Sequence, residues 1–212
     1  CLEANGSVRW ARSFGGLGRD EANDVAVGPD GSIYLSGTFE GLVQIDGQPL
    51  ISSGGADGFL IKLDPKGSLQ WEQTVGGPGE DSGQSVTVAS DGSVRWVGNV
   101  GEEAALDGAP LASSGNGDVF VAKLSHTGSV DWMQTAGGEE EDQAQVVVIE
   151  PKTGYTYVGG GTSDGVQGNA FLLQYDDNGT LNWGTKITGA MDNQVLDLAA
   201  DESGVYLAGN FE

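Results

Sequence analysis

One phrase occurs four times along the chain, and this repetition constrains the fold more than any other feature of the sequence. Each copy runs from a glycine through a tryptophan to a second glycine. The copies are GSVRWARSFGG (6–16), GSLQWEQTVGG (67–77), GSVDWMQTAGG (128–138) and GTLNWGTKITG (179–189). A shift of 61 residues superimposes Trp10 on Trp71 and Trp71 on Trp132, and a shorter shift brings Trp132 to Trp183. A fixed period of this kind indicates a repeat architecture.

Each repeat unit reads as four short strands, because apolar and polar residues alternate with a period of two. In the second unit the predicted strands are 85–89, 94–97, 119–124 and 129–135. The chain contains 37 glycines without a three-residue period, which is typical of many turns and not of collagen. Four strands per unit at this spacing predict an all-β fold, a β-propeller of four-stranded antiparallel blades.

The repeat divides the chain into a single propeller region with an incomplete blade at each end. The predicted parts are a blade remnant (1–16), three complete blades (19–77, 80–138 and 141–189) and a partial blade (192–212). We expect the remnant to form an outermost strand. We also expect a fragment of a longer propeller, because closed propellers typically have four to eight blades. One alternative is a four-bladed ring that the N-terminal strand completes. Another takes Cys1 as the lipid-modified first residue of a mature lipoprotein.

The repeated tryptophans Trp10, Trp71, Trp132 and Trp183 lie on the last strand of each unit. A residue that recurs in every unit suits a role that every unit shares, so we interpret them as structural anchors that pack between blades. An aromatic platform for a sugar is the alternative.

Charge and rare residues limit the classes of function. The chain has 31 acidic and 9 basic residues, a net charge of -22, which disfavours nucleic acid and anionic membrane surfaces as partners. No apolar run approaches the roughly 20 residues of a membrane span. His126 is the single histidine and Cys1 the single cysteine. These counts exclude multi-histidine metal sites and intrachain disulfides, and they argue against Ser-His-Asp catalysis.

Acidic residues cluster just before or within the first strand of each unit. Because strands alternate in direction, these segments share one face with the long connections 38–56 and 99–117, and we predict that this face binds partners. The predicted binding residues are Asp20, Glu21, Asp24, Glu80, Asp81, Glu141, Asp142 and Asp192. One interpretation is a ring of carboxylates that holds Ca²⁺ or a basic partner. The other is that each recurring Asp accepts backbone N–H groups and fixes a turn. We expect no other cofactor.

The units resemble the bacterial β-propeller repeat family called SBBP. The resemblance rests on Asp57-Gly-Phe-Leu-Ile-Lys-Leu, Gly67, Trp71, Gly76-Gly77, Asp81, Asp91-Gly92 and Trp96-Val-Gly98, and it extends over nearly the whole chain. The third unit departs from the pattern, because it lacks about ten residues of the connection between its second and third strands. The resemblance implies a propeller fold and a secreted or surface location in bacteria, and it implies no common catalytic site.

We therefore expect a non-catalytic β-propeller that serves as a binding or scaffolding module in a bacterial extracellular or envelope assembly. The expected partner is a protein or glycan, within a larger chain or assembly, and the expected location is extracellular, cell-surface or periplasmic. One alternative is a carbohydrate-active hydrolase or lyase that uses channel-facing carboxylates. Another is a purely architectural subunit of a large complex.

Overall fold

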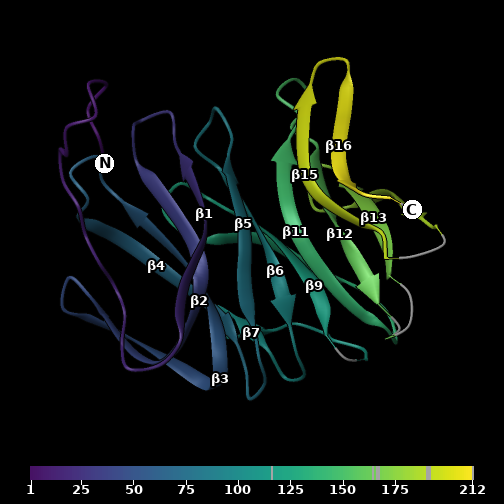
Figure 1. Cartoon of the computed structure of the whole chain (residues 1–212), viewed down its shortest axis with the longest axis horizontal. Coiled ribbons are helices and arrows are strands. Elements are labelled where there is room, and N and C mark those ends of the chain that lie inside the picture. The colour runs from purple at the N-terminus through teal and green to yellow at the C-terminus, as the bar shows by residue number, and fades with distance from the viewer. Residues whose placement is uncertain (116, 164, 166–167, 190–191, 212) are drawn as a thin grey trace.

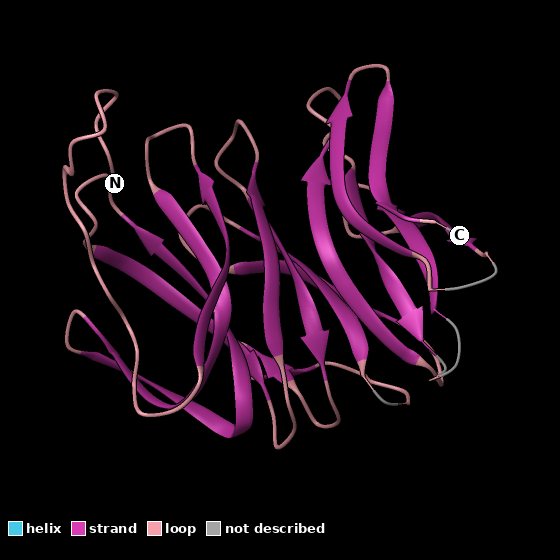
Figure 2. Ribbon diagram, viewed as in Figure 1, coloured by secondary structure: helices cyan, strands magenta, loops and turns pink. Residues whose placement is uncertain are grey.

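The chain folds into strands, turns and loops throughout the part that the structure describes. The computed structural model describes residues 1–115, 117–163, 165, 168–189 and 192–211. Within these ranges no helix is present (Figure 2), and so no apolar helix that could cross a membrane. The strands form four antiparallel sheets, which stand side by side in the order of the sequence (Figure 1). The predicted all-β class and antiparallel pairing are confirmed.

Each of the first three sheets is built around one four-stranded unit. The first sheet contains β1 (Asp20–Val27), β2 (Ile33–Ile45), β3 (Gln48–Leu63) and β4 (Leu69–Gly76), extended by β7 (Ala105–Leu106) and β8 (Ala109–Pro110). The second contains β5 (Ser82–Val88), β6 (Val94–Val100), β9 (Asp118–Leu124) and β10 (Val130–Ala136). The third contains β11 (Glu141–Ile149), β12 (Thr156–Ser163), β13 (Gly168–Tyr175) and β14 (Leu181–Ile187). The fourth contains β15 (Gln194–Asp201) and β16 (Gly204–Asn210).

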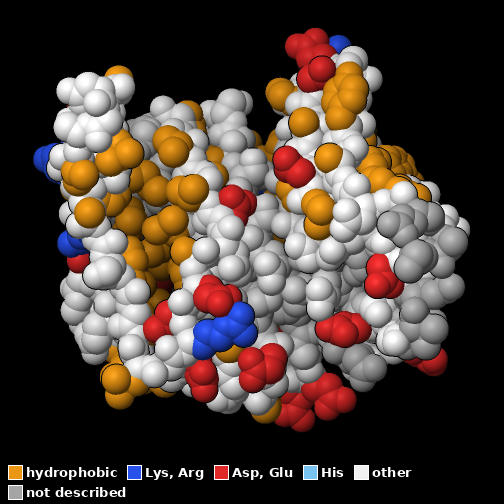
Figure 3. Space-filling model, in the orientation of Figure 1, with side chains coloured by type: hydrophobic (Ala, Val, Ile, Leu, Met, Phe, Trp, Pro, Cys, Tyr) orange, Lys and Arg blue, Asp and Glu red, His pale blue; other side chains and the backbone are white. Residues whose placement is uncertain are grey.

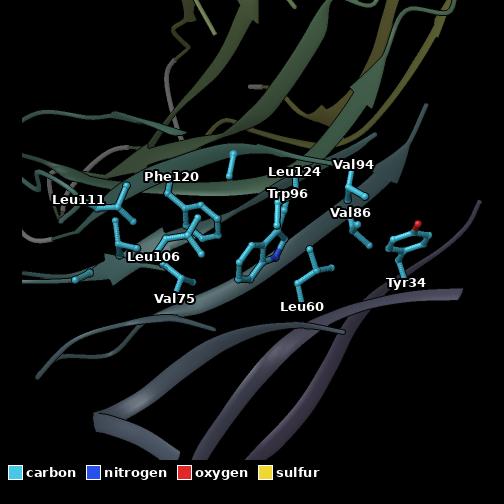
Figure 4. Packing of buried hydrophobic residues seen from close by; sticks show 13 residues of the cluster. Tyr34, Leu60, Val75, Val86, Val94, Trp96, Leu106, Leu111, Phe120 and Leu124 are labelled. Atoms are coloured by element: carbon cyan, nitrogen blue, oxygen red, sulfur yellow. The ribbon is translucent and has the colours of Figure 1, made fainter. Parts of the chain in front are cut away.

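Strand β9 shows why the sheets stack. Its side chains alternate between two faces, and both faces are apolar. Phe120 and Leu124 pack toward the first sheet, in a cluster with Leu60 (Figure 4). Val119 and Val121 pack in the cluster toward the third sheet. A strand that is apolar on both faces has to lie between two neighbours, which fixes the row of sheets.

The first strands of the units come together at one side of this row. Strand β1 contacts β5, β5 contacts β11, and β11 contacts β15. All four begin at the same end, the lower end in Figure 1. The residues just before and within these strands are therefore brought onto one face, although about sixty residues separate them in the sequence.

The repeated tryptophans connect consecutive units. Each of three indole N–H groups donates to a carbonyl in the turn between the third and fourth strands of the next unit, and each ring lies against the glycine of that turn. The pairs are Trp10 with Pro65 O at 3.1 Å, Trp71 with His126 O at 3.1 Å and Trp132 with Asp177 O at 2.9 Å. Trp183 has no such turn beside it among the described residues, and it is 39% exposed.

A buried charged group joins the second and third sheets. Arg95 is 1% exposed, and its Nη2 donates to Asp177 Oδ1 at 2.7 Å. The Lys123 ammonium donates to the same carboxylate oxygen at 2.6 Å. The Asp177 carboxylate therefore compensates two cations, and its backbone carbonyl accepts the Trp132 indole N–H.

Two predicted segments differ from the expectation. Residues 1–16 were expected to form an outermost strand, but they contain only an isolated bridge between Leu2 and Val8. In the part of the chain that the structure describes, no named strand pairs with them. The connection 38–56 was expected to be a long loop. Most of it is a hairpin instead, since β2 continues to Ile45 and β3 starts at Gln48.

Candidate functional site

A polar groove crosses the face on which β1, β5 and β11 begin, and we call it the inner groove. Its volume is about 470 Å³, and a smaller continuation of about 330 Å³ beside β15 shares Glu141 and Gln143 with it. Acidic side chains gather over this region in the lower half of Figure 3. The carboxylates that line the groove are Glu21, Glu40, Glu80, Asp81, Glu141 and Asp142, and Arg19 is the one cation among its lining residues.

The structure brings most of the predicted binding residues to this groove. Of the eight, five line it: Glu21, Glu80, Asp81, Glu141 and Asp142. Asp192 lines the continuation. Asp20 and Asp24 lie elsewhere: Asp20 borders a small apolar cavity on the outer side of the first sheet, and Asp24 points to β5.

The recurring aspartate closes the turn that precedes each first strand. Its Oδ2 accepts the backbone N–H of the glycine four residues earlier. The pairs are Gly16 N with Asp20 at 2.7 Å, Gly77 N with Asp81 at 2.8 Å and Gly138 N with Asp142 at 2.9 Å. The same contact in three units is the one expected if each aspartate fixes a turn.

Two further predicted residues also hold backbone. Asp24 Oδ2 accepts Ser85 Oγ at 2.8 Å and Val86 N at 2.9 Å, so it ties β1 to β5. Asp192 Oδ1 accepts Gly168 N at 2.8 Å. Asp192, although it is acidic and precedes the fourth unit's first strand, is not the structural counterpart of Asp20, Asp81 and Asp142. Asn193 occupies that position, because its N–H donates to Gly168 O as Asp81 N–H donates to Ala56 O.

Burial raises the pKa values of several carboxyl groups in and beneath the groove. Asp57, which is 2% exposed, has its pKa raised to about 6, mainly by burial and further by the charge of Asp81, while the Ser53 N–H opposes the rise. Burial also raises the pKa of Asp81 and of Asp142, against the backbone N–H groups that favour their charged forms. Asp57 Oδ1 has no hydrogen-bond partner among the described residues.

The exposed glutamates supply the accessible charge. Glu80 and Glu141 occupy equivalent positions in successive units, and Arg19 occupies the same position in the first unit. Arg19 pairs with Glu21 at 2.9 Å. The negative field of the groove is therefore strongest on its β5 and β11 side.

Sequence reasoning missed the amide side chains of the groove. Asn23, Gln84, Asn99 and Gln143 line it beside the carboxylates. Asn23 Nδ2 donates to Gly83 O at 2.8 Å, and Asn99 Oδ1 accepts Ala144 N at 2.8 Å, so both bridge neighbouring sheets. The available signal was a polar residue at alternate positions of each first strand, where a buried strand would be apolar.

The arrangement of the groove's side chains bears on the metal and sugar sites that the sequence suggested. Among the described residues no group of three or more His, Cys, Asp or Glu side chains is arranged to hold a metal ion. No aromatic side chain lines the groove or its continuation. The groove therefore offers mainly charge and hydrogen bonds, with apolar contact from small side chains such as Ala56 and Val100.

Comparison with known proteins finds one distant similarity. No protein-family model matches the chain. The sequence is 27% identical over 155 residues to the regulatory protein FlaEY of Caulobacter vibrioides. The match covers 69% of this chain and 16% of that protein, so the chain spans less than a fifth of the length of this relative.

Proposed function

We propose that the protein is part of a β-propeller of the SBBP type and acts as a non-catalytic binding module in a bacterial envelope or extracellular assembly. Four observations support the propeller: the 61-residue repeat, the four-stranded units, the packing of each sheet on the next, and the row formed by β1, β5, β11 and β15. Fractionation of the bacterial cells that make the protein tests the location.

The inner groove of this module binds a basic segment of a partner protein. The observation that carries this proposal is the groove's charge: six carboxylates and one guanidinium line it, and that guanidinium is paired with Glu21. Clefts lined by one sign of charge concentrate field and attract the opposite charge. The absence of aromatic side chains from the lining favours a peptide over a glycan. Similarity to a protein named as regulatory is in keeping with a role in protein binding.

The raised pKa values of Asp57 and Asp81 bear on the alternative of a hydrolase or lyase. Buried carboxyl groups with raised pKa values are candidate general acids. However, Asp57 does not line the groove, and both oxygens of Asp81 accept backbone N–H groups, from Gly77 and Gly101. These contacts support a structural role for the carboxyl groups and favour the binding module.

The proposal is tested by titrating the protein with an oligolysine peptide and with an oligoglutamate peptide of equal length. The oligolysine peptide should bind, and its affinity should fall as salt is added. Replacing two exposed groove carboxylates, Glu80→Gln with Glu141→Gln, should weaken binding about tenfold, because each contributes about 0.5–1 kcal/mol.

The matched control is Glu72→Gln with Glu202→Gln, which removes the same charge outside the groove. It should change the affinity less than about twofold, since distant charges are screened. If the control weakens binding as much as the groove variant, the peptide responds to net charge alone and the groove is not its site.

A further inference from the structure

In the first two units, the hairpin between the second and third strands fills space beside a sheet. In the second unit, β7 adds to the edge of β4, where Leu106 lies opposite Val75. Leu106 and Leu111 are buried beside Val75 and Phe120, between the first and second sheets (Figure 4). In the first unit, the equivalent side chains, all buried, are Val43, Ile45 and Leu50.

The third unit has no segment of comparable length at this place. Residues 101–117 separate β6 from β9, whereas only residues 164–167 separate β12 from β13. Strand β10 is the counterpart of β4, and it pairs with β9 on one side only. No strand among the described residues pairs with its other edge.

A cavity of about 520 Å³ lies where the hairpin of the third unit would stand, and we call it the outer cavity. Ala136 and Gly137, the counterparts of Val75 and Gly76, form one side of it. Phe171, the counterpart of Phe120, forms part of the opposite side. The outer cavity is thus bounded by the same positions that enclose Leu106 and Leu111 one unit earlier.

Two wall residues of the outer cavity are smaller than their counterparts in the preceding unit, and one is larger. Ala136 replaces the larger Val75, and Gly184 replaces Met133, which packs against the cluster of the second unit. Leu173 replaces the smaller Ala122 and forms an apolar wall beside Phe171. Protein interiors are close-packed, and space that lacks an apolar neighbour costs stability. An outside group that supplies the missing aliphatic side chains would remove this cost.

The rim of the outer cavity is acidic. Glu139, Glu140 and Asp142 stand around it with one cation, Lys186. The Lys186 ammonium already contacts Glu140 Oε2 at 3.0 Å. The rim therefore favours basic residues on either side of the aliphatic group.

We propose that the outer cavity binds an extended segment of a partner protein that carries leucine-like side chains flanked by basic residues. The segment adds to the free edge of β10 at Ala136 and Gly137, as β7 adds to β4. Its aliphatic side chain lies against Phe171 and Leu173, and its basic residues face the rim. This mode of recognition adds a strand to an exposed edge. It uses the edge of β10, whereas the inner groove lies on the face of the first strands, and Asp142 borders both sites.

The probe is a peptide with the sequence of residues 104–112 and lysines at both ends. It should shift the backbone amide NMR signals of Ala136 and Gly137 and bind saturably. The same peptide with serine in place of both leucines should bind at least about tenfold more weakly, because apolar anchors dominate such contacts. A peptide that leaves both amide signals unchanged at saturating concentration would overturn the proposal.

Gly184→Met places the methionine of the second unit in the outer cavity. Because a Cβ there meets only Leu173 Cδ2, at 2.9 Å, the protein should stay folded and lose peptide binding by about tenfold or more. Leu173→Ala should also weaken binding. Leu181→Ala, at an exposed position of β14, the strand that contains Gly184, should not. Peptide affinity that is unchanged in both cavity variants would overturn the proposal.

Two further measurements separate the outer cavity from other sites. The groove variant Glu80→Gln with Glu141→Gln should leave binding of the leucine peptide unchanged within about twofold. An equal loss would place the peptide in the inner groove and overturn the proposal. Another outcome is dimerisation that increases with protein concentration and disappears in Gly184→Met. This result would assign the outer cavity to a second copy of the chain and overturn the proposal of a partner segment.

Discussion

Trp71→Ala tests whether the repeated tryptophan holds one sheet to the next. The Trp71 ring lies against Gly128 of the second unit, and its Nε1 donates to His126 O at 3.1 Å. Its ring also packs edge-on against Tyr34, with a centroid distance of 5.8 Å. Truncation removes all three contacts and leaves the turn of the next unit uncovered.

The cost follows from these contacts. Most of the ring is buried, so truncation loses about two-thirds of the roughly 200 Å² that a tryptophan can bury, about 3 kcal/mol. The hydrogen bond adds about 1 kcal/mol, and the aromatic pair about 0.5–1 kcal/mol. We expect Trp71→Ala to lower the free energy of unfolding by about 3–5 kcal/mol.

Trp183→Ala is the matched control, because it removes the same side chain from the same position of a unit whose next turn is missing from the described chain. Trp183 is 39% exposed and keeps only a tilted contact with Tyr157, at 6.1 Å between centroids. About three-fifths of this ring is buried, so its loss should cost about 3 kcal/mol. This cost is smaller than for Trp71→Ala, because among the described residues Trp183 makes no hydrogen bond to a following turn. Both changes in the free energy of unfolding would be measured by urea unfolding followed by circular dichroism. Equal destabilisation by the two variants would refute the assignment of the tryptophan to contacts between units.

Three further predictions concern turns, protons and buried charge. At Gly128 φ is +91°, and a Cβ would lie 2.9 Å from an indole carbon of Trp71, whereas at Gly6 φ is +83° and the space is open. Gly128→Ala should therefore lower the free energy of unfolding by at least about 1 kcal/mol more than Gly6→Ala. Equal losses would contradict the collision with the ring. The pKa of Asp57 is raised to about 6, so the free energy of unfolding should fall as the pH rises from about 4 to about 6, and Asp57→Asn should flatten that dependence in urea titrations. If the free energy of unfolding depends on pH as steeply in Asp57→Asn as in the original protein, the dependence arises from other groups. Asp177→Ala leaves the buried Arg95 without its carboxylate partner. The substitution should lower the free energy of unfolding, measured by heat or denaturant, by about 2–3 kcal/mol. A loss below about 0.5 kcal/mol would mean that solvent replaces the carboxylate.

The strands could be predicted because each carries its own signal. The predicted strands 119–124 and 94–97 match β9 and β6 closely, since the alternation of Phe120, Ala122 and Leu124 with valines is a period-two pattern on a strand buried on both faces. The turns between the third and fourth strands could also be predicted from local sequence, because each requires a positive φ, and a glycine marks that position. Features determined by neighbouring residues are visible in the sequence.

Partners across sheets could not be predicted in the same way. Residues 101–117 read as a connecting loop, and nothing local indicates that Leu106 pairs with Val75 of the preceding unit. Arg95 reads as an exposed strand residue, yet it is 1% exposed because Asp177, which lies in the next unit, meets it. Both features depend on how units stack, which a single unit does not encode.

Recurrence in the sequence pointed to structure, and departures from recurrence point to sites. The aspartate that recurs as Asp20, Asp81 and Asp142 accepts the same turn N–H in each of the three units, so its repetition reflects a need that these units share. One residue before each of these aspartates, the chain has Arg19, Glu80 and Glu141, and this variable position lines the inner groove. The outer cavity likewise arises where one unit lacks a segment that the other two contain. A binding surface on a repeat protein has to differ from unit to unit to recognise an irregular partner. The positions at which the units disagree are therefore the ones to mutate first.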